Sequence, residues 1–238
     1  MPPRLFVFVG RFGSGKTEIA VNFAIGLAQG RYPTQGGWSK PPAPFDSHAA
    51  LVDLDIVTPY FRSRELGEVL RPFNVRVVSP AAVGRYLDLP AISPEILGAI
   101  EQDRQMVVLD VGGDPQGARA LGQYSPAITR REYAGYFVVN PFRPFTDSTE
   151  GIQKAILEVE RTSRLTMTAL VSNPNMMDET TPELILDGHQ RVLDAAEAIG
   201  LPVAFLCVEE ALAEQVRPLL GALLVLPIKR FFDLQWTI

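Results

Sequence analysis

Residues 10–17 constrain this chain more than any other feature of its sequence. They read GRFGSGKT, follow the apolar run at residues 5–9 and precede the helical spacing of Ile19, Phe23 and Leu27. The pattern G-x-x-x-x-G-K-[ST] requires glycines, a lysine and a hydroxyl at fixed places, and a chain of this length contains it by chance about 1% of the time. Because it lies between a strand and a helix, the sequence predicts a phosphate-binding loop.

The residue types in this loop match the chemistry of phosphate binding. Gly10, Gly13 and Gly15 permit positive φ angles and bring backbone N–H groups close to phosphate oxygens. Lys16 can reach the β- and γ-phosphates, and the Thr17 hydroxyl can bind a Mg²⁺ ion that bridges them. The residues expected to contact the nucleotide in this loop are Gly10, Arg11, Phe12, Gly13, Ser14, Gly15, Lys16 and Thr17.

Composition is that of one globular domain covering residues 1–238. The chain is 47% hydrophobic and 21% charged, which suffices for a large core. Its formal charge of -5 disfavours nonspecific binding to nucleic acid or to anionic membranes.

Cysteine usage and hydropathy indicate a cytoplasmic protein. Cys207 is the one cysteine, so no disulfide framework or C-x-x-C metal site is possible. No apolar run approaches the ~20 residues of a membrane span. We therefore expect a cytoplasmic protein with no membrane span and no metal other than magnesium.

Apolar strands alternate with helical patterns along the chain. Strands are predicted at residues 5–9, 49–54, 75–78, 106–109, 135–139, 165–172, 202–208 and 223–226. Ser93 with Pro94, and Thr181 with Pro182, are typical helix starts, and Asp147 with Glu150 predicts a capping box. Such alternation favours an α/β fold with a doubly wound, mostly parallel sheet.

Residues 31–47 interrupt this alternation. Their prolines and glycines predict a long surface loop without regular structure. Trp38 within it is expected to fold back onto the domain. His189 lies on the apolar side of a predicted helix and is expected to be a buried, satisfied histidine.

Polar residues follow three of the predicted strands. Asp55, Asp110 and Asn173 should converge beside the phosphate loop, because ligands bind at the carboxyl ends of strands in open parallel sheets. Asp110 is the expected magnesium ligand together with Thr17, and Asp55 is the candidate for orienting the attacking water and for a place beside the metal. The amides of Gly112 and Gly113 could sense the γ-phosphate.

Three segments resemble the MinD/ParA and nitrogenase-iron-protein group of P-loop ATPases. They are residues 10–17 (GRFGSGKT), 52–65 (VDLDIVTPYFRSRE) and 109–117 (LDVGGDPQG). The resemblance implies a homodimeric, Mg²⁺-dependent ATPase that switches an unidentified client protein. Arg11 stands where the group has a signature lysine that reaches across the dimer, so an arginine acting in trans is a reasonable hypothesis.

The resemblance also bears on the nucleotide base. Asn173 resembles the adenine-contacting asparagine of the group, with the Pro227 region expected nearby. The guanine motif N-K-x-D is absent from the sequence. ATP is therefore favoured over GTP.

Two other functions remain open on the sequence. A small-molecule kinase or ligase could use Arg62 and Arg64 to clamp an anionic substrate under the loop at residues 31–47 or the connection at 79–95. A binding module could hold nucleotide without hydrolysing it.

Overall fold

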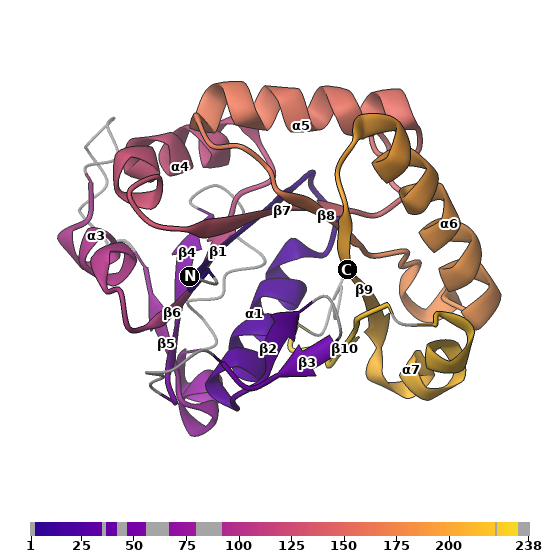
Figure 1. Cartoon of the computed structure of the whole chain (residues 1–238), viewed down its shortest axis with the longest axis horizontal. Coiled ribbons are helices and arrows are strands. Elements are labelled where there is room, and N and C mark those ends of the chain that lie inside the picture. Colours follow the sequence, from indigo (N-terminus) through magenta and orange to yellow (C-terminus); the bar gives the residue numbers. More distant parts are fainter. Residues whose placement is uncertain are drawn as a thin grey trace, which may run out of the picture.

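A parallel sheet of eight strands forms the centre of the molecule (Figure 1). The computed structural model describes residues 3–34, 37–41, 47–55, 67–79, 92–221 and 223–232. The strand order is β10-β9-β8-β7-β1-β6-β4-β5, and every pairing in this sheet is parallel. Its strands are β1 (Leu5–Gly10), β4 (Ala49–Leu54), β5 (Val75–Val78), β6 (Met106–Val111), β7 (Tyr133–Val139), β8 (Ala169–Ser172), β9 (Val203–Glu209) and β10 (Val225–Ile228).

Helices cover both faces of this sheet, as the continuous apolar strands require. They are α1 (Lys16–Ala28), α2 (Gly67–Leu70), α3 (Pro94–Glu101), α4 (Pro115–Ile128), α5 (Thr149–Ser163), α6 (Pro182–Ile199) and α7 (Glu210–Val216). Of two large core clusters, one joins the sheet to α3, α4, α5 and α6, and the other joins it to α1 (Figure 1). A smaller third cluster joins β9 and β10 to α6 and α7. The α/β, doubly wound prediction is confirmed.

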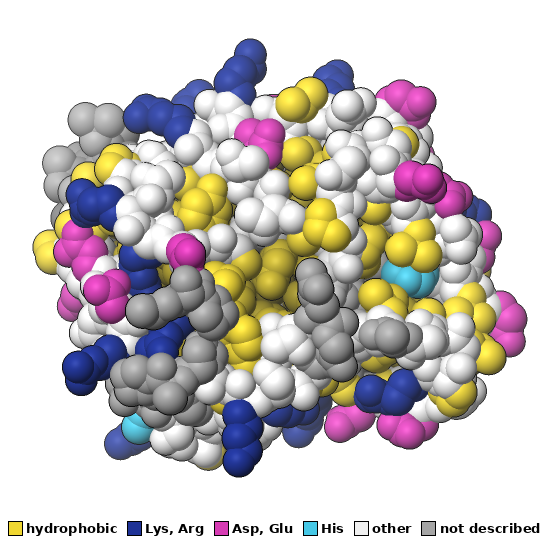
Figure 2. Space-filling view, viewed as in Figure 1, with side chains coloured by type: hydrophobic (Ala, Val, Ile, Leu, Met, Phe, Trp, Pro, Cys, Tyr) yellow, Lys and Arg dark blue, Asp and Glu magenta, His cyan; other side chains and the backbone are white. Residues whose placement is uncertain are grey.

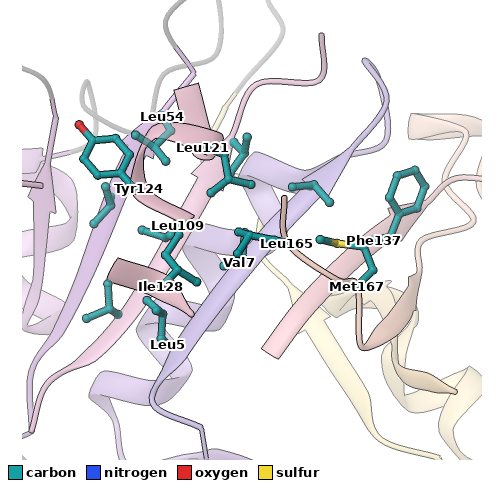
Figure 3. Close-up of a cluster of buried hydrophobic side chains, with 14 of the residues drawn as sticks. Leu5, Val7, Leu54, Leu109, Leu121, Tyr124, Ile128, Phe137, Leu165 and Met167 are labelled. Atoms are coloured by element: carbon teal, nitrogen blue, oxygen red, sulfur yellow. The ribbon is translucent and has the colours of Figure 1, made fainter. Parts of the chain in front are cut away.

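Strand β1 divides its side chains between the two clusters. Leu5 and Val7 point to the cluster under α4 and α5, where Leu109, Leu121 and Ile128 pack around them (Figure 3). The alternate residues of β1, two phenylalanines, point to the side of α1. Burying each such side chain contributes about 1.5–3 kcal/mol. The central strand, and with it the loop that follows, is thereby held from both faces.

The segment at residues 31–47 contains regular structure, contrary to the sequence-based expectation. Strands β2 (Tyr32–Thr34) and β3 (Gly37–Ser39) pair antiparallel as a small separate ribbon. A proline is tolerated there because a two-stranded ribbon has free edges. The prediction for Trp38 is confirmed, since its Nε1 donates to the Val225 carbonyl at 3.2 Å and its ring packs on Phe23.

Several element boundaries differ from those expected. The N-cap of α5 is Ser148, which accepts a hydrogen bond from the Gly151 amide at 3.2 Å, so the capping box at Asp147 is wrong. Strand β8 begins at Ala169 and not at residue 165. Helices α4 and α7 were not predicted. The start of α6 after Thr181 and its end at Gly200 are confirmed.

The chain after β10 returns to α1. Phe231 and Phe232 pack against the core on that side, as expected for the aromatic end of the sequence. Residues 56–66, 80–91 and 233–238 lie outside the described ranges, and so do the expected Arg62 and Arg64. Within those ranges, no helix combines the length and the apolar character that crossing a membrane requires.

Candidate functional site

The predicted phosphate loop connects β1 to α1. Gly13 and Gly15 have φ angles of 78° and 83°, which are left-handed conformations that favour glycine. Helix α1 begins directly after Gly15, and no side chain of the described residues caps its first amides. The N-terminal N–H groups and positive dipole end of α1 are therefore left for an anion.

Close packing explains the other glycines of the site. A β-carbon on Gly10 would lie 2.8 Å from the Val138 carbonyl oxygen, and one on Gly113 would lie 2.7 Å from the Phe12 backbone nitrogen. Gly10 does not adopt a positive φ, so that part of the expectation is wrong. Its role is close approach to β7, and Gly113 brings the end of β6 against the phosphate loop.

Three carboxylates lie at the strand ends next to this loop. Asp53 and Asp110 are register partners on β4 and β6, and both are fully buried. The Asp55 amide donates to the Asp53 carboxylate at 2.9 Å. A β-carbon on Gly112 would lie 3.2 Å from the Asp55 carboxylate. The geometry thus brings Asp55 and Asp110 to the edge of the sheet where the loop begins.

Asp110 stands out among these carboxylates. Neither of its oxygens has a hydrogen-bond partner within the described part of the chain. Burial raises the pKa of Asp110 to about 7; the charge of Lys16 and the neighbouring Thr17 hydroxyl oppose this shift, and the charges of Asp53 and Asp55 add to it. An unpartnered buried carboxylate is costly unless it serves a ligand.

Lys16 and Thr17 complete the polar centre at the first turn of α1. They are only 6% and 7% exposed. The described residues contain no cluster of three or more His, Cys, Asp or Glu side chains arranged to hold a metal. The chemistry of the donor set nevertheless fits Mg²⁺ bound with phosphate, because this ion is usually held by one or two carboxylates plus phosphate oxygens and water.

Asn173 reaches the phosphate loop from the end of β8. Its Nδ2 donates to the Ser14 carbonyl at 2.7 Å, and a β-carbon on Gly15 would lie 2.4 Å from that nitrogen. In this structure Asn173 therefore braces the loop that precedes α1. Its predicted contact with a base remains a prediction.

The end of β10 is tied to α1, which brings the Pro227 region to the same helix. The Asn22 side chain donates to the Lys229 carbonyl and accepts from the Lys229 amide, both at 2.9 Å. Glu18 accepts from the Phe231 amide at 2.9 Å. The segment after Pro227 is thus held along α1, beside the helix that begins at the phosphate loop.

Arg11 points away from the carboxylates, toward α5. Its Nη2 forms an ion pair with Glu158 Oε2 at 2.5 Å, and the two side chains are 26% and 38% exposed. The pair borders a small recess between the ends of β1 and β6 and helices α4 and α5. In this state Arg11 is engaged within its own chain.

On the face seen in Figure 2, charges of both signs are interspersed: Asp and Glu are prominent on the side of α6 and α7, and Lys and Arg alternate with Asp and Glu on the side of α3. No continuous basic band crosses the coloured side chains of this face. The expectation against nonspecific nucleic-acid binding remains a prediction.

Comparison with known proteins defines the class of the fold. No protein-family model and no curated protein sequence matches this chain. Among solved structures, the cell division protein FtsY of Thermotoga maritima aligns with a TM-score of 0.51 and 16% identity, covering 88% of this chain and 63% of that one. Chloroplast FtsY of Physcomitrella patens gives a TM-score of 0.53 and 15% identity, covering 87% and 58%.

The chain thus spans less than two thirds of the length of these FtsY structures. At such low identity the likeness establishes the fold, which is that of P-loop NTPases. It does not single out the MinD/ParA group within them.

Two residues at the loop were not found by sequence reasoning. Glu158 lies in the middle of α5, and Arg143 lies in the turn after β7, where its side chain would contact a β-carbon placed on Gly13. Each comes near the loop through packing between distant segments. To predict these two positions one needs the order of strands across the sheet, which a single sequence does not give.

Proposed function

We propose that this chain is a Mg²⁺-dependent ATPase of the MinD/ParA type, acting as a homodimeric nucleotide switch for a client protein. The observation that carries the proposal is the buried, unpartnered Asp110 opposite Lys16 and Thr17 at the uncapped start of α1. A carboxylate, an ammonium and a hydroxyl in this arrangement fit a nucleotide triphosphate with its metal.

Each side chain then has a defined task. Lys16 and the amides of the loop bind phosphate oxygens, while Thr17 and Asp110 would hold Mg²⁺. When bound, this ion neutralises the negative charge that develops on the phosphate oxygens. Asp55 accepts a hydrogen bond from the attacking water, orienting its oxygen toward the γ-phosphorus.

The switch would act through the segments that touch the phosphates. Gly113 packs on the loop backbone, so displacement by the γ-phosphate would be passed to α4, whose N-cap is Asp114. Ordering of such segments by the γ-phosphate is a common device in P-loop proteins. ATP is proposed because the guanine motif is absent and because Asn173 and the Pro227 region flank α1.

Nucleotide binding and phosphate release test this proposal. We expect Lys16→Ala to weaken the binding of a fluorescent ATP analogue with Mg²⁺ by about 100-fold, because a charged hydrogen bond to phosphate is lost. Asp55→Ala should retain affinity and lose at least about 100-fold in turnover. Parallel titrations with the GTP analogue test the base.

Arg161→Ala, at the exposed end of α5, serves as the matched control. Thermal melting of each variant establishes that it is folded. Unchanged affinity in folded Lys16→Ala would refute phosphate binding at this loop. Tight binding without phosphate release in the wild type would refute the ATPase and leave a binding module, whereas phosphate transfer to a metabolite would indicate a kinase.

A further inference from the structure

Arg143 lies against the phosphate loop of its own chain. A β-carbon built on Gly13 would be 3.6 Å from both Cδ and Nε of Arg143 and 3.9 Å from its Cγ. Gly13 has no side chain to keep the arginine away. The Cδ and Nε atoms of Arg143 therefore lie where a side chain on Gly13 would touch them, next to the loop that is expected to cradle phosphates.

The turn that carries Arg143 is firmly held. The Asn140 carbonyl accepts hydrogen bonds from the Arg143 amide at 3.1 Å and from the Thr146 hydroxyl at 2.8 Å. The Asn140 side chain accepts from the Phe142 amide at 3.1 Å. Asn140 and Thr146 are each 1% exposed. Such a turn fixes the arginine in advance, which lowers the entropic cost of using it to bind a ligand.

Backbone strain at the same turn supports a binding role. Phe145 has a φ angle of 70° although it carries a bulky side chain. Non-glycine residues in this conformation cost of order 1–3 kcal/mol and cluster at ligand clamps and active sites. The turn thus keeps a strained conformation next to the phosphate loop.

Among the described residues, the guanidinium of Arg143 has no acidic partner. Its Nε is buried without a hydrogen bond, and no ion pair of Arg143 is found among the residues that the structure describes. By contrast, Arg11 pairs with Glu158, and Arg230 pairs with Asp178 and Glu209. A guanidinium that is partly buried and unpaired is suited to an anionic ligand.

We propose that Arg143 binds the phosphate tail of the nucleotide in cis, as a second cation beside Lys16. This inference rests on the proposed nucleotide site. Arg143 acts from the side of β7, whereas Lys16 acts from α1, so the two cations flank the phosphate loop. Arg143 fulfils this role in the monomer and needs no partner subunit.

Titration of a fluorescent ATP analogue with Mg²⁺ tests the inference. Arg143→Ala should weaken binding roughly tenfold, since it removes charge-assisted hydrogen bonds. Arg143→Lys should recover part of the affinity because it keeps the charge and loses the fork. Arg161→Ala should bind as the wild type does. Melting temperatures of all variants are measured in the absence of nucleotide to separate binding from folding.

Lys16→Ala in the same experiment separates the two proposals. If Lys16→Ala loses affinity and folded Arg143→Ala does not, the inference about Arg143 is overturned and the nucleotide site stands. If Lys16→Ala retains affinity, the nucleotide site itself is refuted. Equal affinities of folded Arg143→Lys and Arg143→Ala would reduce the role of Arg143 to fork-specific contacts and overturn its assignment as a cation beside Lys16.

Discussion

Buried polar groups are treated differently in two regions of this molecule. Around β8 and α6 they are paired: His189 Nδ1 lies 3.0 Å from the Ser172 hydroxyl, and Asn140 Nδ2 donates to the Asn175 carbonyl at 2.8 Å. At the phosphate loop, the Asp110 carboxylate and the Ser14 hydroxyl are buried without a hydrogen-bond partner in the described part of the chain.

The difference indicates that the paired buried groups serve the fold and that the unpaired ones serve a ligand. A paired buried group is close to neutral for stability, while an unpaired one costs about 1–3 kcal/mol, more if it is charged. A fold tolerates that cost where a ligand supplies the missing partner. The comparison predicts that neutralising an unpaired group stabilises the free protein, and that disturbing a paired group destabilises it.

Asp110→Asn is the strongest test of the unpaired region. The folded-state pKa of about 7 lies above the ordinary 3.8, so the folded protein binds more protons between these values and wild-type stability falls as pH rises through this window. The variant lacks this loss. Above pH 7 we expect the free energy of unfolding of Asp110→Asn to exceed that of the wild type by up to about 4 kcal/mol. Urea denaturation from pH 4 to pH 8 measures this difference.

The same variant should lose its response to the metal. Mg²⁺ with nucleotide raises the melting temperature of a protein that binds them, and Asp110→Asn removes the carboxylate proposed to hold the ion. A variant that is less stable than the wild type at pH 8, or that keeps the full response to Mg²⁺, would contradict the role assigned to Asp110.

His189 tests the paired region, where stability should change with pH in the direction opposite to that expected for Asp110. Burial lowers its pKa to about 4, so the unfolded chain binds the proton more readily. Wild-type stability from this group is complete above pH 6.5 and is lost as pH falls toward 4, by about 2 kcal/mol at pH 5. His189→Gln should flatten this part of the urea-denaturation profile, while the exposed His48→Gln should not. Equal slopes in all three proteins would contradict the assignment.

The fold was largely predictable because its signals are local. Buried parallel strands are continuous apolar runs, and these identified β4 and β5 at their observed bounds. Helix α4 was missed because Gly117, Gly122 and Pro126 interrupt its apolar pattern. The β2–β3 ribbon was missed because its prolines and glycines are typical of a loop.

The site divides in the same way. The phosphate loop was predicted because its residues are adjacent in sequence, and Asp110 was predicted because it ends an apolar strand. Glu158 and Arg143 were not predicted. Their positions depend on the packing of α5 over the loop and on the pairing of β7 with β1, which are contacts between distant segments.

Arg11 and Glu158 give the smallest expected effect on stability, because a partly exposed ion pair contributes at most about 1 kcal/mol. Their effect on assembly should be larger. An Arg11 that acts across a dimer must first leave Glu158, so Glu158→Gln should dimerise at lower protein concentration with Mg²⁺ and a non-hydrolysable ATP analogue. Arg11→Ala should not dimerise. Light scattering after size exclusion measures both, with ADP as the second nucleotide state.

Glu197→Gln, an exposed change on α6, is the control for removing a negative charge. If Glu197→Gln and Glu158→Gln shift the dimer equilibrium equally, net charge and not the release of Arg11 is responsible. If all proteins remain monomeric in every nucleotide state, Arg11 has no partner phosphate to reach. The pair with Glu158 is then a permanent part of the monomer. Arg11 would then be a structural residue, like the paired polar groups around β8 and α6.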